Sequence, residues 1–454
     1  MPHQEEGVRW LLNRKPSRGI LADDMGLGKT FQIIGLLRNS PWLSTLIIAP
    51  PVLIASWTAE LRACGFGVSS LQSGVTKWTG LATGVAKTVC LSTYPKTPNI
   101  ADAIAAGRMD PFQRVILDEG HCIRNGEGTR RGSACFRIVA DAESRWILSA
   151  TPVQNSSRDW RTLCRWLGLA VEEGSDTATI MLRRTMEDLR RTDSDAAVPP
   201  PPRFVVRELS IAGGAEKKLF RVLCDQLEDA MESSSTSGLL KLELYLRIQQ
   251  FLVHPQIYIE AMRGKFGDGY PRPDWMGSTT KWTAFTKDLA ASVANKEPVI
   301  VFCQFRDEMD RVAAAATAMG ASVWSIRGGM SSVAIGEAVN DGRAAAAAAT
   351  AAVVFIVQII SGGVGLNLQF CRRILFLSQH WNPAVVHQAV GRAVRIGSDV
   401  SVEIVTYRIC DEALDNLDIR MMEVHAAKIA AARDVCSSLF HGFLGTPLDE
   451  VVEA

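Results

Sequence analysis

The sequence lacks three features that would place a protein in a class at once. Its 49 basic and 48 acidic side chains almost cancel, which leaves a net charge of +1. A polyanionic partner would therefore bind in a local groove, because the chain has no global basic field. The N-terminal residues MPHQEEGVRW do not form a secretory signal. No stretch reaches ~18 apolar residues free of charge, so a membrane span is not expected.

Cysteine is present, but it is not arranged for metal binding. Ten cysteines are scattered from Cys64 to Cys436, and no two have the CxxC spacing of a zinc site. Free thiols in a reducing compartment are the simplest explanation. We therefore expect an intracellular protein, in the nucleus if the source is eukaryotic and otherwise in a viral or bacterial cytoplasm.

The chain is long enough for two or three folded domains, with 454 residues of which 47% are hydrophobic and 21% charged. Short apolar runs alternate with helix-like segments in two parts of the chain, which predicts an α/β fold with parallel sheets. The expected strands are residues 19–22, 46–50, 88–93, 114–118 and 146–149, then 299–302, 322–326, 353–357 and 373–377.

The pattern changes in the middle of the chain. Residues 199–202 are four prolines, which stiffen a connection, and helical segments follow them. We predict a first α/β lobe over residues 1–170, a helical connector over 171–275, a second α/β lobe over 276–425 and a helical tail over 426–454.

A candidate phosphate-binding loop follows the first predicted strand. Residues 23–30 read DDMGLGKT and open an apolar helix. Glycines let backbone N–H groups surround phosphates, and a helix N-terminus favours an anion. Lys29 would reach the β- and γ-phosphates and Thr30 would ligate Mg²⁺. The general pattern has glycine where Asp23 stands, so a glycine-rich turn with a chance lysine is the alternative.

The predicted strand over residues 114–118 ends in two carboxylates, Asp118 and Glu119. Side chains alternate along a strand, so the two can serve different partners. Asp118 would hold Mg²⁺ and Glu119 would polarise the attacking water. An isolated pair of this kind is usually a solvated strand end, but a phosphate loop upstream in the same predicted sheet favours the catalytic interpretation.

Three residues near the end of the second predicted lobe have helical spacing. Gln388, Arg392 and Arg395 stand at i, i+4 and i+7, so on a helix they would share one face. Such a face can present two guanidinium groups to a developing phosphate charge, as arginine fingers do. Alone, this spacing is more typical of a solvated basic face.

Taken in order, these motifs resemble those of the Swi/Snf family of superfamily 2 helicase-like ATPases. The segments that carry the resemblance are PHQEEGVRW (2–10), LADDMGLGKT (21–30), IAPP (48–51) with Trp57, STY (92–94), DEGH (118–121), RWILSATPVQN (145–155), LRRT (182–185), IVFCQF (300–305), SGGVGLNL (361–368), WNP (381–383) and QAVGRAVRIG (388–397). The family accepts an acidic residue where Asp23 stands. The resemblance implies two RecA-like lobes, an ATP-binding lobe and a helicase C-terminal lobe.

The same resemblance implies a set of site residues. The catalytic residues would be Lys29, Asp118, Glu119, Gln388, Arg392 and Arg395. ATP would be bound by Gln4, Asp24, Met25, Gly26, Leu27, Gly28, Lys29, Thr30 and Gly363, and Mg²⁺ by Thr30 and Asp118. DNA would be contacted by Pro50, Thr93, Ser361 and Gly362. The lobes would be coupled by His121, Ser149, Ala150 and Thr151.

The implied function is that of an ATP-dependent translocase, which hydrolyses ATP to move along duplex DNA. It would remodel or displace bound protein in chromatin remodelling, transcription or DNA repair. Double-stranded DNA would bind through its phosphate backbone, and a nucleosome, another DNA-bound protein or accessory subunits would be further partners. Two alternatives stay open: a strand-separating DNA or RNA helicase of superfamily 2, and a nucleotide-binding scaffold without turnover. The PVQN, LRRT and RIG segments disfavour the helicase, and the presence of Lys29, Glu119 and Arg395 disfavours the scaffold.

The chain departs from the family pattern at three sites. Residues 149–151 read SAT where the family often has TGT, Ser378 stands where an acidic residue is common, and Ser398 stands where glutamine is common. The stretch 114–167 resembles most the helicase-like transcription factor branch, although the chain has no cysteine spacing for that branch's RING insertion. None of the three is a predicted catalytic residue.

Overall fold

The computed structural model describes residues 1–71, 87–170, 177–192, 198–211, 214–233, 237–277, 279–362, 366–378, 380–398, 400–410 and 417–435. The chain divides into two compact units, the first built mainly from Met1–Val198 and the second mainly from Pro199–Val394 and Ser398–Ala427. Each unit contains one parallel sheet. The predicted α/β class with two parallel-sheet lobes is therefore confirmed.

The sheet of the first unit has the strand order β3-β4-β2-β5-β6-β1-β7. Its strands are β1 Arg18–Leu21, β2 Thr45–Ala49, β3 Gly67–Ser70, β4 Thr88–Thr93, β5 Arg114–Asp118, β6 Ser144–Leu148 and β7 Met181–Leu182. The central strands β2 and β5 are buried along their whole length. Continuous burial is what a parallel sheet covered on both faces requires, and it explains the apolar runs 46–49 in β2 and 115–117 in β5.

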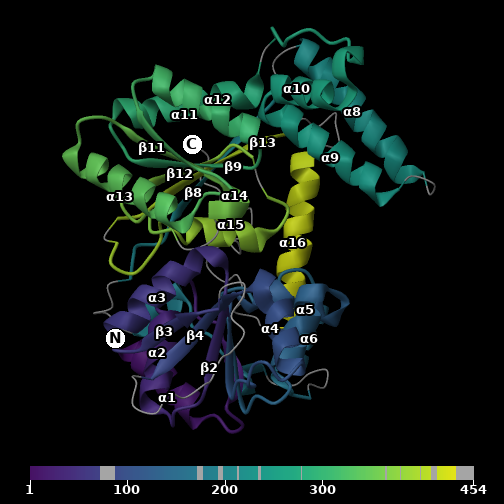
Figure 1. Ribbon diagram of the computed structural model, residues 1–454. Helices are drawn as coiled ribbons and strands as arrows, with labels where there is room; N and C mark the ends of the chain where they lie inside the picture. The colour runs from purple at the N-terminus through teal and green to yellow at the C-terminus, as the bar shows by residue number, and fades with distance from the viewer. Residues whose placement is uncertain are drawn as a thin grey trace. The chain divides into compact units, whose positions relative to one another are not determined.

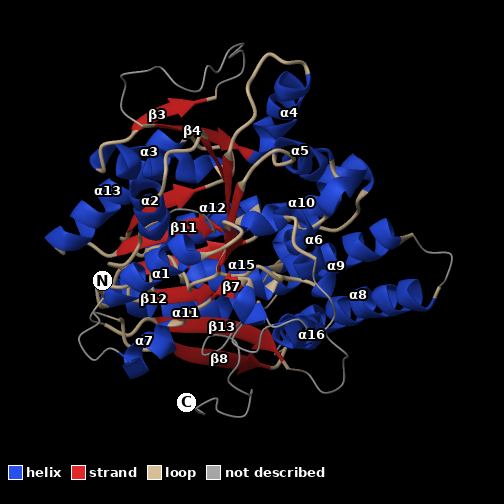
Figure 2. Cartoon of the chain, turned by 90° about the horizontal axis from the view of Figure 1, so that it is seen from below, coloured by secondary structure: helices blue, strands red, loops and turns tan. Residues whose placement is uncertain are grey.

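Helices cover both faces of this sheet, with α1–α3 on one face and α4–α6 on the other (Figures 1 and 2). The helices of this unit are α1 Pro2–Asn13, α2 Lys29–Asn39, α3 Ile54–Ala63, α4 Thr97–Ala105, α5 Arg130–Ile138, α6 Ser157–Leu167 and α7 Met186–Thr192. Leu36 of α2 and Trp57 of α3 pack with Ile116 and Trp146 of the sheet in one buried core. The chain's short 3₁₀ helices are η1 Pro51–Leu53, η2 Tyr94–Lys96, η3 Gly120–Ile123, η4 Gly126–Gly128, η5 Thr177–Thr179 and η6 Gly267–Gly269.

The sheet of the second unit has the order β10-β11-β9-β12-β13-β8. Its strands are β8 Arg203–Leu209, β9 Val299–Cys303, β10 Ser322–Ile326, β11 Val353–Gln358, β12 Arg373–Phe376 and β13 Glu403–Ile409. Helices α11 and α12 cover one face of it, and α13 to α15 lie on the other (Figure 1). The later helices are α11 Thr280–Ala294, α12 Arg306–Ala318, α13 Ser332–Ala348, α14 Ile359–Gly362, α15 Pro383–Val390 and α16 Leu417–Val435.

The stretch predicted as a helical connector, residues 171–275, contains more than helices. Helices α8 Gly214–Glu232, α9 Gly238–Val253 and α10 Pro255–Phe266 pack around a core of their own that includes Phe220 and Phe251. Two strands also come from this stretch: β7 pairs with β1 in the first sheet, and β8 pairs with β13 in the second. The helical interpretation missed both strands, and the predicted domain boundaries stay predictions.

Cysteines within the described ranges are all free, and no group of three or more His, Cys, Asp or Glu side chains there is arranged to hold a metal ion. Burial raises the pKa of the Cys90, Cys135 and Cys164 thiols to about 12. These thiols therefore stay protonated and unreactive at neutral pH. No helix in the described part of the chain is both long and apolar enough to span a membrane.

A buried carboxylate on α11 joins three strands of the second sheet. Asp288 accepts hydrogen bonds from Arg207 of β8 at 3.1 and 3.2 Å, from the Tyr407 hydroxyl of β13 at 2.9 Å and from Arg373 of β12 at 3.2 Å. Burial acts to raise the pKa of Asp288, but the hydrogen bonds from Arg207 and Tyr407 outweigh it and lower the pKa. The ionised carboxylate is therefore the form that holds helix and strands together.

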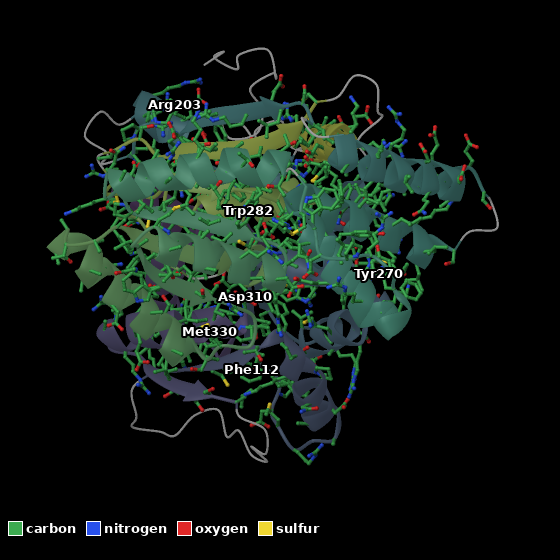
Figure 3. The ribbon with its side chains drawn as sticks, turned by 90° about the horizontal axis from the view of Figure 1, so that it is seen from above. Phe112, Arg203, Tyr270, Trp282, Asp310 and Met330 are labelled. Atoms are coloured by element: carbon green, nitrogen blue, oxygen red, sulfur yellow. The ribbon has the colours of Figure 1, made fainter. Side chains whose placement is uncertain are left out.

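Replacing Asp288 with asparagine should destabilise the second unit by about 2 kcal/mol, because the half-exposed Arg207 and the buried Arg373 lose a charged hydrogen-bond acceptor, although Arg373 keeps Glu403. Asp310 on α12 (Figure 3) supplies the matched control, since it pairs with Arg327 at the surface. Asp310→Asn should cost less than about 1 kcal/mol. Urea denaturation followed by circular dichroism measures both, and equal losses would contradict the role given to Asp288.

Candidate functional site

The predicted site residues of the first unit gather at one edge of its sheet. In a parallel sheet all carboxyl ends lie on the same side, where ligands bind. The loop 22–28 follows β1, Pro50 follows β2, Thr93 ends β4, Glu119 follows β5 and Ser149 follows β6. Strands β2 and β4 are neighbours in register, so Pro50 and Thr93 lie at adjacent strand ends.

The loop after β1 has the backbone of an anion cradle. Gly26 and Gly28 both have a φ of 83°, a left-handed conformation that favours glycine, and α2 begins directly afterwards at Lys29. A Cβ atom at Gly28 would lie 2.2 Å from Gln4 Nε2, so a side chain there would displace the Gln4 side chain from the loop. Two left-handed glycines directly before a helix N-terminus are the arrangement that turns backbone N–H groups toward a bound anion.

The amine of Lys29 is held at the centre of this loop. Nζ donates to the carbonyl oxygens of Asp23 at 2.7 Å and Asp24 at 3.2 Å. Burial lowers the pKa of Lys29, while the charges of Glu119, Asp23, Asp118 and Asp24 act to raise it. The next residue, Thr30, is half-buried in the first turn of α2.

Two side chains of α1 hold the loop from the other side. His3 Nε2 lies 3.0 Å from the Leu27 carbonyl oxygen, to which Gln4 Nε2 donates at 3.3 Å. The structure therefore brings Gln4 to the loop, together with the buried Met25 and Leu27. His3 was not among the predicted residues, because nothing in the sequence distinguishes its buried imidazole from an ordinary helical histidine.

Asp118 is buried at the end of β5 with three specific contacts. Its Oδ2 accepts from Trp57 Nε1 at 2.7 Å, its Oδ1 accepts from the Glu119 amide at 3.0 Å, and its carbonyl accepts from the Tyr94 hydroxyl at 2.8 Å. Burial, and then the charge of Glu119, raises the pKa of Asp118 to about 6, against the opposing hydrogen bond from Trp57. Trp57 thus packs in the core and also stabilises the carboxylate.

Glu119 links the acidic pair to the predicted coupling residues. Its φ of 53° and ψ of 51° are left-handed, a strained conformation for a residue with a side chain. His121 Nδ1 lies 3.3 Å from Glu119 Oε2 and 3.1 Å from Ser149 Oγ, and Ser149 Oγ accepts from the Thr151 amide at 3.3 Å. The residues Glu119, His121, Ser149 and Thr151 therefore form one continuous chain of contacts.

The donor set at this edge fits a magnesium–nucleotide complex. The Asp118 carboxylate and the Thr30 hydroxyl are oxygen donors, which Mg²⁺ prefers. The raised pKa of Asp118 arises partly from the charge of Glu119, so a dication would relieve a repulsion that already exists there. The glycine-lined loop supplies backbone donors for the phosphates.

In the second unit, the expectation that Gln388, Arg392 and Arg395 share one helix face was wrong. Helix α15 contains Gln388 but ends at Val390, with Gly391 as its C-cap. The Arg392 amide then bonds to the Ala389 carbonyl at 3.1 Å, three residues back, which tightens the chain into a turn. Glycine also has a weak helix propensity. Gln388 and Arg392 are buried, and Arg395 lies beyond the helix.

The other predicted residues of the second unit lie near the carboxyl end of β11. Ser361 and Gly362 form the end of α14, which follows that strand directly. Gly363, predicted to bind ATP, lies outside the described residues. The actions of Arg392 and Arg395 on a nucleotide, and of Ser361 and Gly362 on DNA, stay predictions.

The sequence interpretation also missed a basic face on α6. Arg158, Arg161 and Arg165 are exposed at i, i+3 and i+7, while the opposite face of the helix is buried. With residues 125–128 they line an open cavity of about 360 Å³. Arg165 pairs with Glu127 at 2.6 Å. The arginine spacing in the sequence is the signal that would have revealed this face.

Comparison with known proteins identifies both halves of the chain. Residues 3–177 match the SNF2-related domain, and residues 281–397 match the helicase conserved C-terminal domain. The chain belongs to the SNF2-related family of helicase-like ATPases. The resemblance drawn from the motifs is confirmed, and the chain is an ATP-using enzyme of this family.

Relatives of this SNF2-related ATPase include a "Probable global transactivator" of Orgyia pseudotsugata multicapsid polyhedrosis virus, 26% identical over 87% of this chain and 84% of that protein. A "Putative ATP-dependent helicase/translocase YwqA" of Bacillus subtilis is 25% identical over 91% of this chain and 47% of its own length. Among solved structures, "Sulfolobus solfataricus SWI2/SNF2 ATPase core in complex with dsDNA" aligns over 99% of this chain and 95% of that chain, with 18% identity and a TM-score of 0.39. The chain spans less than half the length of many relatives that it matches.

Removing the hydrogen bond from Trp57 should move the pH dependence of ATP hydrolysis. The indole N–H stabilises the ionised form of Asp118, so Trp57→Phe should raise the pKa of Asp118 further, and the acid limb of kcat/KM should shift upward by about one pH unit. The matched control is Trp146→Phe, which loses a buried indole bonded to Ser144 in the same core. Identical profiles for the two variants would show that Trp57 does not tune Asp118.

Proposed function

We propose that this SNF2-related ATPase is a translocase that hydrolyses ATP to move along double-stranded DNA. The observation that carries the proposal is the single sheet edge shared by the phosphate loop, the Asp118–Glu119 pair and the chain from His121 to Thr151. Pro50 and Thr93 lie at the same edge, so a DNA backbone there would be adjacent to the nucleotide. The name of the Bacillus relative, a putative helicase/translocase, agrees with this reading.

The residues of the first unit have complementary chemical roles in this proposal. Lys29 and the loop N–H groups would bind the phosphates, and Thr30 with Asp118 would hold Mg²⁺. Bound Mg²⁺ would neutralise charge on the phosphates. Glu119 would orient the attacking water and accept its proton.

Other parts of the chain would complete the nucleotide site. Gln4 would read the adenine, and Gly363 would also bind ATP. Gln388, Arg392 and Arg395 would stabilise charge on the transferred phosphoryl group, as arginine fingers do.

Coupling to DNA would start at the general base. The His121 imidazole lies between Glu119 and Ser149, so a change at Glu119 reaches residues 149–151 through two short contacts. Pro50, Thr93, Ser361 and Gly362 would hold DNA phosphates in alternation. Backbone contacts carry no direct sequence information, so binding would be nonspecific and sensitive to salt. Remodelling of a nucleosome, transcription, DNA repair and accessory subunits are finer roles of the same motor.

ATP hydrolysis should be stimulated by duplex DNA and lost in Glu119→Gln, because that variant lacks the base that positions the water. The loss should be about 100-fold or more. Turnover is measured with no nucleic acid, duplex DNA, single-stranded DNA and RNA, and displacement of a triplex strand measures movement on the duplex. Glu143→Gln, an exposed carboxylate beside β6, is the matched control and should behave as wild type.

Each alternative has its own outcome in this experiment. Equal or greater stimulation by single strands or RNA, with strand separation, would replace the translocase with an unwinding helicase. Absence of turnover under every condition would favour a nucleotide-binding scaffold. Stimulation by duplex DNA without triplex displacement would leave an ATPase that does not translocate.

The arginine face of α6 should extend the DNA contact of the first unit. Reversing two charges in Arg158→Glu/Arg161→Glu should weaken duplex binding and reduce the slope of log K against log salt by roughly 2. Fluorescence anisotropy of a labelled duplex at several salt concentrations measures both quantities. Arg137→Glu, whose arginine pairs with Asp102 elsewhere on the surface, is the control. An unchanged slope in the double variant would exclude this face from the DNA path.

A further inference from the structure

Two features of the sequence have no role in the mechanism above: the acidic Asp23 in the phosphate loop, and the LRRT segment at 182–185. The structure brings them together. The amides of Ile20, Ala22 and Asp24 donate in turn to the carbonyls of Ile180, Leu182 and Arg184, at 3.0, 2.7 and 2.9 Å. The pairing of β1 with β7 therefore continues past the end of β1 into the phosphate loop.

Arg184 anchors the first residue of that loop. Asp23 is fully buried, and its carboxylate accepts from Arg184 Nη2 at 2.5 Å and from Arg184 Nε and the Arg184 amide at 3.1 Å each. Gln32 of α2 donates to the same carboxylate at 2.9 Å and accepts from Arg184 Nη2 at 2.9 Å. Glycine at this position would leave the buried guanidinium with only the exposed carboxylate of Glu6, at 3.2 Å, as counter-charge, which explains the departure from the general loop pattern.

Arg183 makes a different set of contacts. Its Nη1 donates to the carbonyl of Ala22 at 2.7 Å and to the carbonyl of Ala150 at 3.0 Å, and its Nη2 donates to Asp24 Oδ1 at 2.9 Å. Ala22 and Asp24 belong to the phosphate loop, whereas Ala150 is the middle residue of the coupling segment 149–151. One planar guanidinium group therefore joins the two segments.

The two arginines fix the backbone on which the nucleotide site depends. Lys29 Nζ rests on the carbonyls of Asp23 and Asp24, the two residues whose side chains the arginines hold. On the other side of Arg183, Ala150 is flanked by Ser149, which contacts His121. The contacts of Arg183 thus connect the amine that would bind phosphate with the chain that begins at Glu119.

We propose that Arg183 is a positioning residue that couples the phosphate loop to the segment 149–151, and that the Arg184–Asp23 pair anchors the loop. This inference rests on the proposed function, because it assigns a relay within the same ATP site. Arg183 touches neither nucleotide nor DNA in this scheme. It acts by setting where Lys29 lies relative to Ser149 and Thr151.

The test compares Arg183→Gln and Arg183→Lys with wild type in ATP hydrolysis with and without duplex DNA. Arg183→Gln should raise KM for ATP and lower the ratio of duplex-stimulated to basal kcat, each about tenfold. Lysine keeps the positive charge but lacks the forked N–H donors of the guanidinium group. Arg183→Lys should therefore restore KM and the stimulation ratio only in part. Arg191→Gln is the matched control, because Arg191 lies exposed on the following helix and pairs there with Glu187.

A second pair of variants separates anchoring from loss of folding. Arg184→Gln leaves the buried Asp23 carboxylate without its partner and should lower the melting temperature. In Asp23→Asn/Arg184→Gln both charges are absent, so the melting temperature should recover while KM for ATP stays raised. If KM recovers together with the melting temperature, the Arg184–Asp23 pair has only a structural role, and the proposal that it anchors the phosphate loop is overturned.

Failure of this inference differs from failure of the proposed function. If duplex DNA does not stimulate the wild-type chain, the proposed function fails. The positioning role of Arg183 is then tested by measuring the affinity of each variant for a fluorescent ATP analogue. Weaker binding in Arg183→Gln but not in Arg191→Gln supports the positioning role. If wild type is stimulated and Arg183→Gln keeps both its KM and its stimulation ratio, the proposed function stands and the positioning role of Arg183 is overturned.

Discussion

The first unit depends on holding four carboxylates around one amine at a buried sheet edge. Asp23, Asp24, Asp118 and Glu119 all act on the charge of Lys29. Removing so many charges from water is costly unless each is paired or hydrogen-bonded. The surrounding contacts serve this need: Asp23 is paired with Arg184, Asp24 with Arg183, Asp118 accepts from Trp57, and Glu119 lies beside His121. Three of these four partners come from segments far away in the sequence.

The negative charge of these carboxylates is only partly balanced by their partners. The unbalanced charge favours binding of a cation. Burial and the charge of Glu119 leave the pKa of Asp118 at about 6, so the pair is a repulsive one that a dication would relieve. Glu119 is kept in a strained left-handed backbone conformation. A site with its donors and charges already in place binds phosphate and metal with little reorganisation, which is the condition for efficient electrostatic catalysis.

The strands that could be predicted from the sequence are the buried ones. β2, β5 and β9 are buried along their whole length and contain apolar runs of three or more residues, because both faces of a parallel sheet are covered. Among the strands that were missed, β3 is only partly buried and β8 is a half-exposed edge strand, and both carry polar residues, whereas β7 is only the two residues Met181–Leu182. Strands β8 and β13 carry paired arginines and acids, such as Arg203 with Glu403. In the sequence these charged residues favour a loop or helix over a buried strand. Burial by neighbours, which sequence does not display, decides those cases.

In the site, as in the fold, features formed by neighbouring residues could be predicted, whereas features formed by residues distant in the sequence could not. The glycine loop and the Asp118–Glu119 pair are contiguous in sequence, so their chemistry can be read directly, whereas Arg184 and Asp23 are separated by 161 positions. The single predicted helix face failed for a local reason, since the backbone tightens at Gly391. Asp23 shows how a distant residue changes the interpretation of a motif. As a lone residue it weakens the match to a phosphate loop, but with Arg184 as its buried partner it strengthens the match, because an acid there is only tolerable if the arginine is present. A departure from a motif is therefore best judged together with the distant residue that compensates its charge.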